Sequence, residues 1–272
     1  MQQATPDQRI YYGILREFHL WGYLTLSNLR DLLLTYPNTL LPYLRKLMKE
    51  KYILDAGYPP VKGGENPLFG RYYCVSRKSP PPAPPFLNYQ IMPRDFRVKK
   101  LAEHEEMPGG CFLMKDEQIV KRHQLWVSYF AAWMQRIMIE EFEPEALLGR
   151  QKTELVPEFF LKKRGWYGRG NMPTSGDPFL TMVPDFLINF GTMQCHIQVE
   201  LTLKSRSRYE RDFEILEPRN QHIIYITPEP EMIPKLKRLH PTGYSIFYMS
   251  LGDRSRFREI MVRMIADSFT DF

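Results

Sequence analysis

The residues best suited to chemistry lie between Pro184 and Tyr209. From Cys195 to Lys204, apolar and polar residues alternate, which predicts a strand with one buried face. Glu200 and Lys204 then share the polar face, about 13 Å apart at about 3.3 Å of rise per residue. A carboxylate and an ammonium group on one strand face can bind a polar ligand or simply face solvent.

A second carboxylate precedes this strand. Pro184-Asp185 opens an apolar segment, and residues 189–192 predict a turn between that segment and the alternating strand. A hairpin would place Asp185 and Glu200 on neighbouring antiparallel strands. Two such carboxylates beside a lysine could hold a hard divalent cation and steady a nucleophile at a phosphate. The same pattern also fits an amphipathic hairpin without chemistry.

This arrangement resembles the PD-(D/E)xK nuclease signature, in which an aspartate, a further acidic residue and a lysine come from a strand pair. The resemblance assigns Asp185 and Glu200 as metal ligands. It differs in one respect, because the position two after Glu200 is Thr202 and the lysine is Lys204. The departure leaves open a site that binds metal but cleaves DNA slowly or not at all.

Length and composition are those of a folded protein with two domains. The chain has 272 residues, of which 43% are hydrophobic and 25% charged. No apolar run approaches a membrane span and the polar start is unlike a signal peptide, so we expect a cytoplasmic protein without membrane insertion. Cys74, Cys111 and Cys195 are widely separated, which predicts reduced structural thiols and no zinc site.

Basic charge is concentrated near the N-terminus. The net charge is +6; residues 1–78 hold 11 Lys/Arg against 6 Asp/Glu, which leaves 26 against 25 for the remainder. A basic domain favours a polyanion such as DNA as its partner.

The order of elements in residues 1–78 predicts a winged helix-turn-helix domain. Helical spacing covers residues 6–20, a second helix capped by Thr25 or Ser27 runs to Leu34, and a third covers 37–51. Two short strands, 52–60 and 69–76, would then form the wing. The third helix and wing would supply the residues that contact double-stranded DNA. Base edges would face Asn38, Thr39 and Tyr43, and phosphates would face Arg45, Lys46, Lys62 and Arg71. A winged helix used for protein contact remains the alternative.

Proline-rich residues 79–85 (SPPPAPP) predict an extended spacer, so we expect a linker and arm over 79–115 and a second domain over 116–272. That domain would begin with a long helix over 116–141 that contains His123. Strand and turn pieces with Glu154 follow, then the hairpin. Helix 205–216, strand 222–228, helix 230–241, strand 244–253 and helix 256–269 complete a restriction-endonuclease-like mixed sheet of the α+β or α/β class.

Over most of its length the chain resembles the replication-relaxation superfamily, in particular MobC-type plasmid mobilisation relaxases. The residues that carry the resemblance are His123 and Leu125, Glu154, Pro184-Asp185 and the run VELTLKSRSRY over 199–209. It implies a site-specific, single-strand nick of DNA, with Mg²⁺ or Mn²⁺, at the origin of transfer of a plasmid or integrative element. By resemblance Lys204 would stabilise developing charge, His123 and Glu154 would assist, and a type IV secretion coupling protein would receive the DNA.

Tyr209 leaves two interpretations open, a covalent nucleophile as in many relaxases, or a side chain that packs its helix on the sheet. The main alternative for the whole chain is a non-catalytic DNA-binding protein: a replication initiator, accessory factor or regulator with a decayed nuclease-like core. A third is an endonuclease that cuts both strands as a homodimer.

Overall fold

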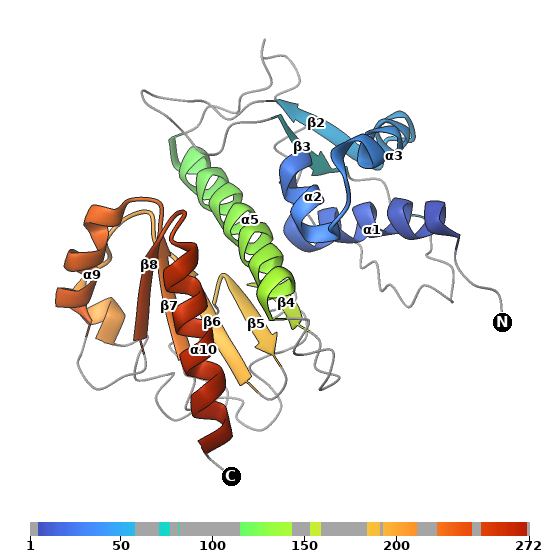
Figure 1. The fold of residues 1–272 in the computed structure, drawn as a ribbon. Helices are drawn as coiled ribbons and strands as arrows, with labels where there is room; N and C mark the ends of the chain where they lie inside the picture. Colours follow the sequence, from blue (N-terminus) through green and yellow to red (C-terminus); the bar gives the residue numbers. More distant parts are fainter. Residues whose placement is uncertain are drawn as a thin grey trace, which may run out of the picture. The chain divides into compact units, whose positions relative to one another are not determined.

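The computed structural model describes residues 5–57, 71–76, 81, 115–142, 153–158, 184–190, 193–210, 222–240 and 246–270. Helices and two sheets make the protein mixed α+β (Figure 1). The chain divides into two compact units, Met1–Arg136 and Ile137–Phe272, which are described one at a time. Residues 77–80 and 82–114 lie outside the described part, so the domain limits expected at 78 and 115 stay predictions.

The first unit begins with three helices: α1 (Pro6–Trp21), α2 (Leu26–Leu33) and α3 (Pro37–Lys49). Local signals set their starts. Thr5 and Thr25 each form a capping box at the beginning of α1 and α2, and Pro37 occupies the first turn of α3. The three predicted helices are therefore confirmed, and Thr25 rather than Ser27 is the cap of α2.

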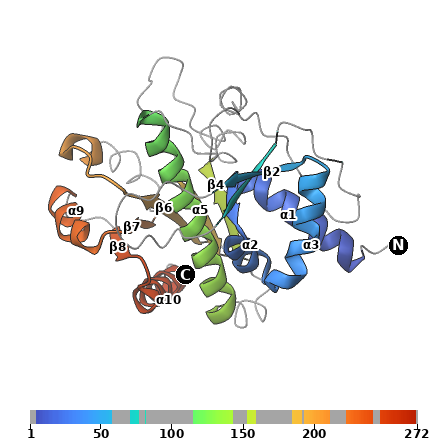
Figure 2. The same ribbon diagram turned by 90° about the horizontal axis from the view of Figure 1, so that it is seen from above.

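The three helices are grouped together in Figure 2 and pack on one another. Phe18, Leu29 and Leu44 are fully buried, one from each helix. A three-stranded antiparallel sheet accompanies them, with β1 (Tyr23–Thr25), β3 (Tyr72–Val75) and β2 (Ile53–Gly57) in that order. The hairpin of β2 and β3 was predicted, whereas β1 was not.

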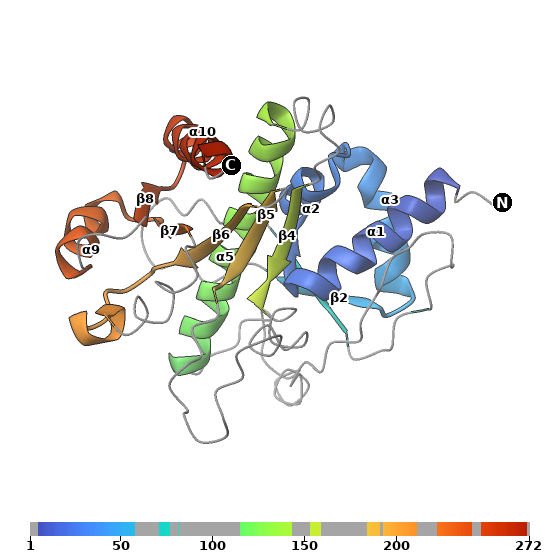
Figure 3. The ribbon, with the colours of Figure 1, turned by 90° about the horizontal axis from the view of Figure 1, so that it is seen from below.

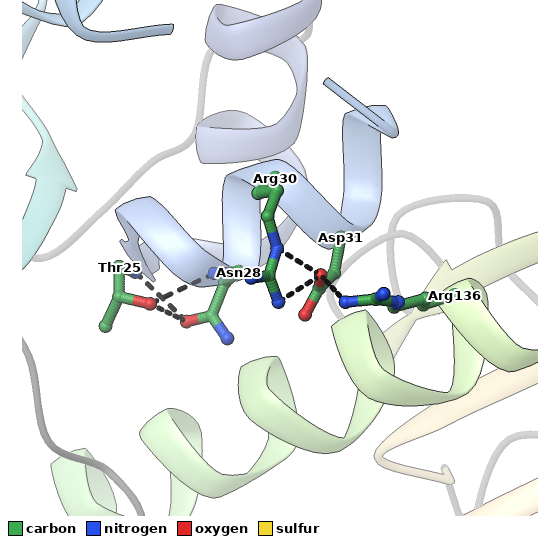
Figure 4. A network of polar contacts seen from close by, with 5 residues as sticks. All are labelled: Thr25, Asn28, Arg30, Asp31 and Arg136. Carbon is green, nitrogen blue, oxygen red and sulfur yellow. Dashed lines mark hydrogen bonds and ion pairs between the residues drawn. The ribbon is translucent and has the colours of Figure 1, made fainter. Parts of the chain in front are cut away.

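Helix α5 (Lys115–Glu141) confirms the predicted long helix, and the division between the units falls within it. The part of α5 that belongs to the first unit makes hydrogen bonds to α1 and α2. The Gln124 side-chain amide donates to the carbonyl of Trp21 at 2.9 Å, and Arg136 contacts Asp31 at 3.2 Å. Figure 4 shows Arg136 and Arg30 converging on Asp31 beside the Thr25 cap.

A five-stranded sheet forms the centre of the second unit (Figure 3). Its strands lie in chain order and comprise β4 (Thr153–Pro157), β5 (Phe186–Phe190), β6 (Met193–Val199), β7 (His222–Thr227) and β8 (Ile246–Ser250). Strands β4, β5 and β6 are antiparallel, whereas β6, β7 and β8 run parallel. The predicted hairpin of β5 and β6 is present.

Helices cover both faces of this sheet. Helix α10 (Arg254–Thr270) places Arg263 over the ring of Phe247 at 5.8 Å, while α9 (Ile233–Leu239) places Lys237 over Tyr248 at 5.6 Å. Because neighbouring residues of a strand point to opposite faces, α9 and α10 lie on opposite sides of β8. A single 3₁₀ turn, η3 (Pro230–Met232), leads into α9.

The predicted extent of the central strand is wrong. Strand β6 ends at Val199, five residues before the expected end at Lys204. The expectation of a single buried face is also wrong, because His196 and Gln198 are buried as well as Cys195 and Ile197. Both sheet faces are covered here, so residue types alternate without a change in exposure.

Cys74 and Cys195 are buried free thiols, while Cys111 lies outside the described residues. None of the helices within the described ranges is sufficiently long and apolar to cross a bilayer.

Candidate functional site

Asp185 is fixed at the point where the chain joins β5. Its backbone N–H donates to the carbonyl of Ile197 at 3.0 Å, and its Oδ2 accepts the N–H of Val199 at 2.7 Å. The carboxylate thus satisfies a donor at the end of β6 and is held one residue from Glu200 along that chain. Its side chain is partly exposed.

Glu200 directly follows β6, the strand that lies between β5 and β7 in the sheet. Its N–H donates to the carbonyl of Ile226 on β7 at 2.9 Å. The side chain is only 2% exposed, and Oε1 lies 2.5 Å from Nζ of Lys204. A buried carboxylate usually requires such a cation, because desolvation strongly penalises an isolated charge.

Lys204 reaches Glu200 by a route that the alternation does not predict. The expected separation of about 13 Å along one strand is wrong, because the chain bends at Leu201 and Thr202. The register of β6 with β7 ends at Val199, which is also the last residue of β6. Lys204 therefore returns onto the carboxylate, with its side chain 26% exposed.

Tyr209 contacts the residue that follows this bend, Lys204. Its hydroxyl accepts the backbone N–H of Lys204 at 3.2 Å, and Nζ of Lys204 lies 5.9 Å from its ring centroid. The side chain is fully buried in a cluster with Ile223, Tyr225 and Leu236. Of the two interpretations of Tyr209, this arrangement favours packing.

His240 completes the layer beneath Lys204. Its ring lies 4.4 Å from the rings of both Tyr209 and Tyr225, and its Nδ1 lies 2.6 Å from the hydroxyl of Tyr248. Burial and, to a lesser extent, the charge of Lys204 lower the pKa of His240 to about 4. The imidazole is therefore neutral at neutral pH and adds no second charge beside the ion pair.

Glu154 is at the wrong end of the sheet to join this group. It lies in β4 opposite Asn189, four residues along β5 from Asp185, which corresponds to about 13 Å. Instead, the backbone N–H of Glu158 donates to the carbonyl of Asp185 at 3.0 Å. The sequence carries a signal for this neighbour, because Pro157-Glu158 repeats the proline–acid pair of Pro184-Asp185.

His123 lies in the first unit, on α5, and its side chain is partly buried. Asp185, Glu200 and Lys204 belong to the second unit. The auxiliary role of His123 stays a prediction.

The residues predicted to contact DNA differ in availability. Asn38, Thr39, Arg45 and Lys46 are exposed on α3. Tyr43 instead donates its hydroxyl to Asp7 at 2.6 Å, and Arg71 pairs with Asp55 at 2.7 Å. Lys62 lies outside the described residues. Tyr36 precedes α3 and is 81% exposed, but the sequence patterns did not mark it as a candidate DNA contact.

The donor set suits a magnesium-type ion better than a soft metal. Asp185 and Glu200 offer oxygen ligands at adjoining strand ends, and Mg²⁺ commonly binds one or two carboxylates together with water and substrate phosphate. Among the described residues, no group of three or more His, Cys, Asp and Glu side chains is arranged to hold a metal. Any ion would therefore depend on water or DNA oxygens for its remaining ligands.

Comparison with known proteins adds no relative, since no family model, curated protein or solved structure matches the chain.

Proposed function

We propose that this protein cleaves one strand of double-stranded DNA in a reaction that requires Mg²⁺ or Mn²⁺. The observation that carries the proposal is the contact between Lys204 and buried Glu200, next to Asp185 at the open end of the β5–β6 hairpin. An ammonium group beside two carboxylates at strand ends is the arrangement expected of a phosphodiester-cleaving site.

The order of elements supports this proposal. A long helix, three antiparallel strands, a crossover and a parallel strand resemble the PD-(D/E)xK nuclease core. In the first unit, α1–β1–α2–α3 followed by the β2–β3 hairpin resembles a winged helix. A DNA-binding unit joined to a nuclease-like unit would give cleavage at a chosen sequence.

Each residue of the site has a role in this proposal. A bound Mg²⁺ or Mn²⁺ would act as a Lewis acid on the phosphate. Asp185 and Glu200 would hold it, and Lys204 would stabilise the negative charge that develops as the bond to phosphorus breaks. We assign the nucleophile to water, because Tyr209 is fully buried with its hydroxyl bonded to Lys204.

The narrower proposal is a relaxase that nicks the origin of transfer of a plasmid or integrative element. It rests on the resemblance of the run over 199–209, and delivery of DNA to a type IV secretion coupling protein would follow from the same resemblance.

One observation favours a second function. Glu200 is nearly excluded from water and already neutralised by Lys204, as in a purely structural ion pair. In that case the second unit would be a decayed core, and the protein would bind DNA without cutting it.

Supercoiled plasmid carrying the DNA adjacent to the gene distinguishes the two functions. Wild-type protein with Mg²⁺ or Mn²⁺ should convert it to the open circle, and Glu200→Gln should abolish the conversion. Glu210→Gln is the matched control, because Glu210 lies in the same segment but pairs with Arg206 at the surface. Binding of the DNA without open circle under either metal would overturn the nicking proposal.

A further inference from the structure

The second unit carries a group of basic side chains next to the candidate site. They come from the segment after Lys204 and from α9, and comprise Arg206, Arg208, Lys235, Lys237 and Arg238, all of them exposed. Residues 79–272 together have only one more basic than acidic residue. In the described residues of these segments, 205–210 and 229–240, the five cations outnumber three carboxylates, Glu210, Glu229 and Glu231.

Buried aromatic contacts bring the two segments together. Tyr209 follows Arg208 directly, and His240 follows the last turn of α9; their ring centroids lie 4.4 Å apart. Leu236 of α9 belongs to the same buried cluster as Tyr209. Figures 1 and 3 show the short helix over 206–210 beside α9. The basic side chains of both segments thus lie around one buried cluster, and we call these five residues the α9 basic face.

Most of this charge is not neutralised. Within the part of the chain that the structure describes, no carboxylate lies in ion-pair range of Arg208, Lys235 or Arg238, and only Arg206 pairs, with Glu210 at 2.8 Å. Across the sheet, α10 provides a contrast. Arg254 pairs with Glu140 and Glu141, Arg258 with Glu141, and Arg256 with Glu259. Unpaired cations grouped on one surface favour a polyanionic partner.

We propose that the α9 basic face binds the phosphate backbone of the DNA strand held for cleavage. The proposal rests on the proposed function, because it treats Lys204 as the beginning of a continuous track from the site. Lys204 is paired with Glu200, and the segment that follows exposes Arg206 and Arg208 before α9 continues the surface. Such contacts would hold the strand in position without reading its sequence.

Basic residues near the C-terminus of α9 could instead only offset the helix dipole. That role would affect stability but not the salt dependence of DNA binding. Each phosphate contact releases counterions, so it contributes about 0.9 to the slope of log affinity against log salt concentration.

The test compares two variants of the full chain that lose equal charge. One is Lys235→Ala/Lys237→Ala/Arg238→Ala on α9, and the other is Arg256→Ala/Arg258→Ala/Arg263→Ala on α10. Binding to a random-sequence fluorescent duplex is titrated at several salt concentrations, with chelator present so that no cleavage occurs. The α9 variant should make the slope shallower by roughly 2 to 3, whereas the α10 variant should leave it close to wild type.

Equal slopes for the two variants would overturn the proposal. So would an unchanged DNA slope with lost binding to phosphatidylserine vesicles, which would assign the surface to lipid. If the triple α9 variant does not fold, Arg208→Gln/Lys235→Gln should still reduce the slope by about 2, and no reduction would count against the proposal. Because the assay contains no metal, a failure of nicking would leave its result unaffected.

Discussion

Glu200 and Glu17 are both buried carboxylates, but their partners differ. Glu200 is 2% exposed but has the ammonium group of Lys204 at 2.5 Å. Glu17 is nearly as buried, yet its partners are weaker: Arg16 at 3.3 Å and the indole N–H of Trp21 at 3.2 Å. Burial consequently raises the pKa of Glu17 despite both neighbours.

Glu17→Gln should therefore stabilise the protein at neutral pH. A raised folded-state pKa means that the wild-type chain loses stability as pH rises above about 4.5, where the unfolded carboxyl ionises freely. We expect a gain on the order of 1 kcal/mol at pH 7 that disappears at acidic pH. Urea unfolding at several pH values measures it, with exposed Glu259→Gln as the control. A less stable Glu17→Gln at pH 7 would show that the attraction of Arg16 outweighs burial.

His240 should give the opposite dependence. Its pKa falls from 6.5 to about 4 among Tyr209, Tyr225 and Tyr248, with Lys204 nearby. The unfolded chain binds the proton more readily, so stability should decrease as pH is lowered from about 6.5 to about 4, by about 2 kcal/mol. In His240→Gln this part of the pH dependence should vanish. An unchanged pH profile in that variant would assign the acid sensitivity to other groups.

At the scale of elements, caps and prolines make helix starts predictable. Thr25 accepts the N–H of Asn28 at 3.0 Å, and the Asn28 side chain accepts the N–H of Thr25, also at 3.0 Å (Figure 4). Ser27, the other residue that sequence alone allowed as a cap, lies exposed within α2.

Thr25→Ala should cost about 1 kcal/mol of stability. The backbone N–H and the side-chain Oδ1 of Asn28 would both lose their hydrogen bond to the Thr25 hydroxyl. Ser27→Ala should change stability by less than about 0.5 kcal/mol. Thermal unfolding of the two variants measures the difference. Equal losses would mean that the helix start is not held by Thr25.

Some strands and strand ends could be predicted from the sequence, and others could not. The β5–β6 hairpin was predictable from its turn and alternating pattern, and so were β7 and β8 from their apolar runs. The end of β6 was not, because it depends on where β7 stops pairing with it. Short β1 was missed for a similar reason, since its partner β3 lies far along the chain.

The candidate site, too, was predictable from the sequence only in part. Asp185 and Glu200 were predictable because a hairpin is local. The return of Lys204 onto Glu200 and the place of Glu158 beside Asp185 were not, because a bend and a third strand determine them. Glu154 was selected by resemblance and lies at the other end of β4.

At the scale of the whole molecule, the chain separates proposed DNA reading from proposed chemistry. Exposed Arg45 and Lys46 lie on α3 in the first unit, and the carboxylates lie in the second. The first unit also contains most of α5, which the sequence had assigned to the second domain.

Arg45→Ala/Lys46→Ala should therefore weaken DNA binding without affecting metal binding. Loss of two phosphate contacts should reduce the salt-dependence slope by about 2. Fluorescence anisotropy with duplex DNA measures the slope, and titration calorimetry with Mn²⁺ provides the second readout. Loss of Mn²⁺ binding in this variant would contradict the separation.

Direct Mn²⁺ binding tests the central claim, that Asp185 and Glu200 form a metal site. Calorimetry on the full chain should detect at least one ion, and Asp185→Asn and Glu200→Gln should each weaken its binding tenfold or more, about 1.4 kcal/mol. Glu210→Gln should bind as wild type does. Equal Mn²⁺ binding by all four proteins, or none by any, would contradict the account and leave Glu200 and Lys204 as a structural ion pair.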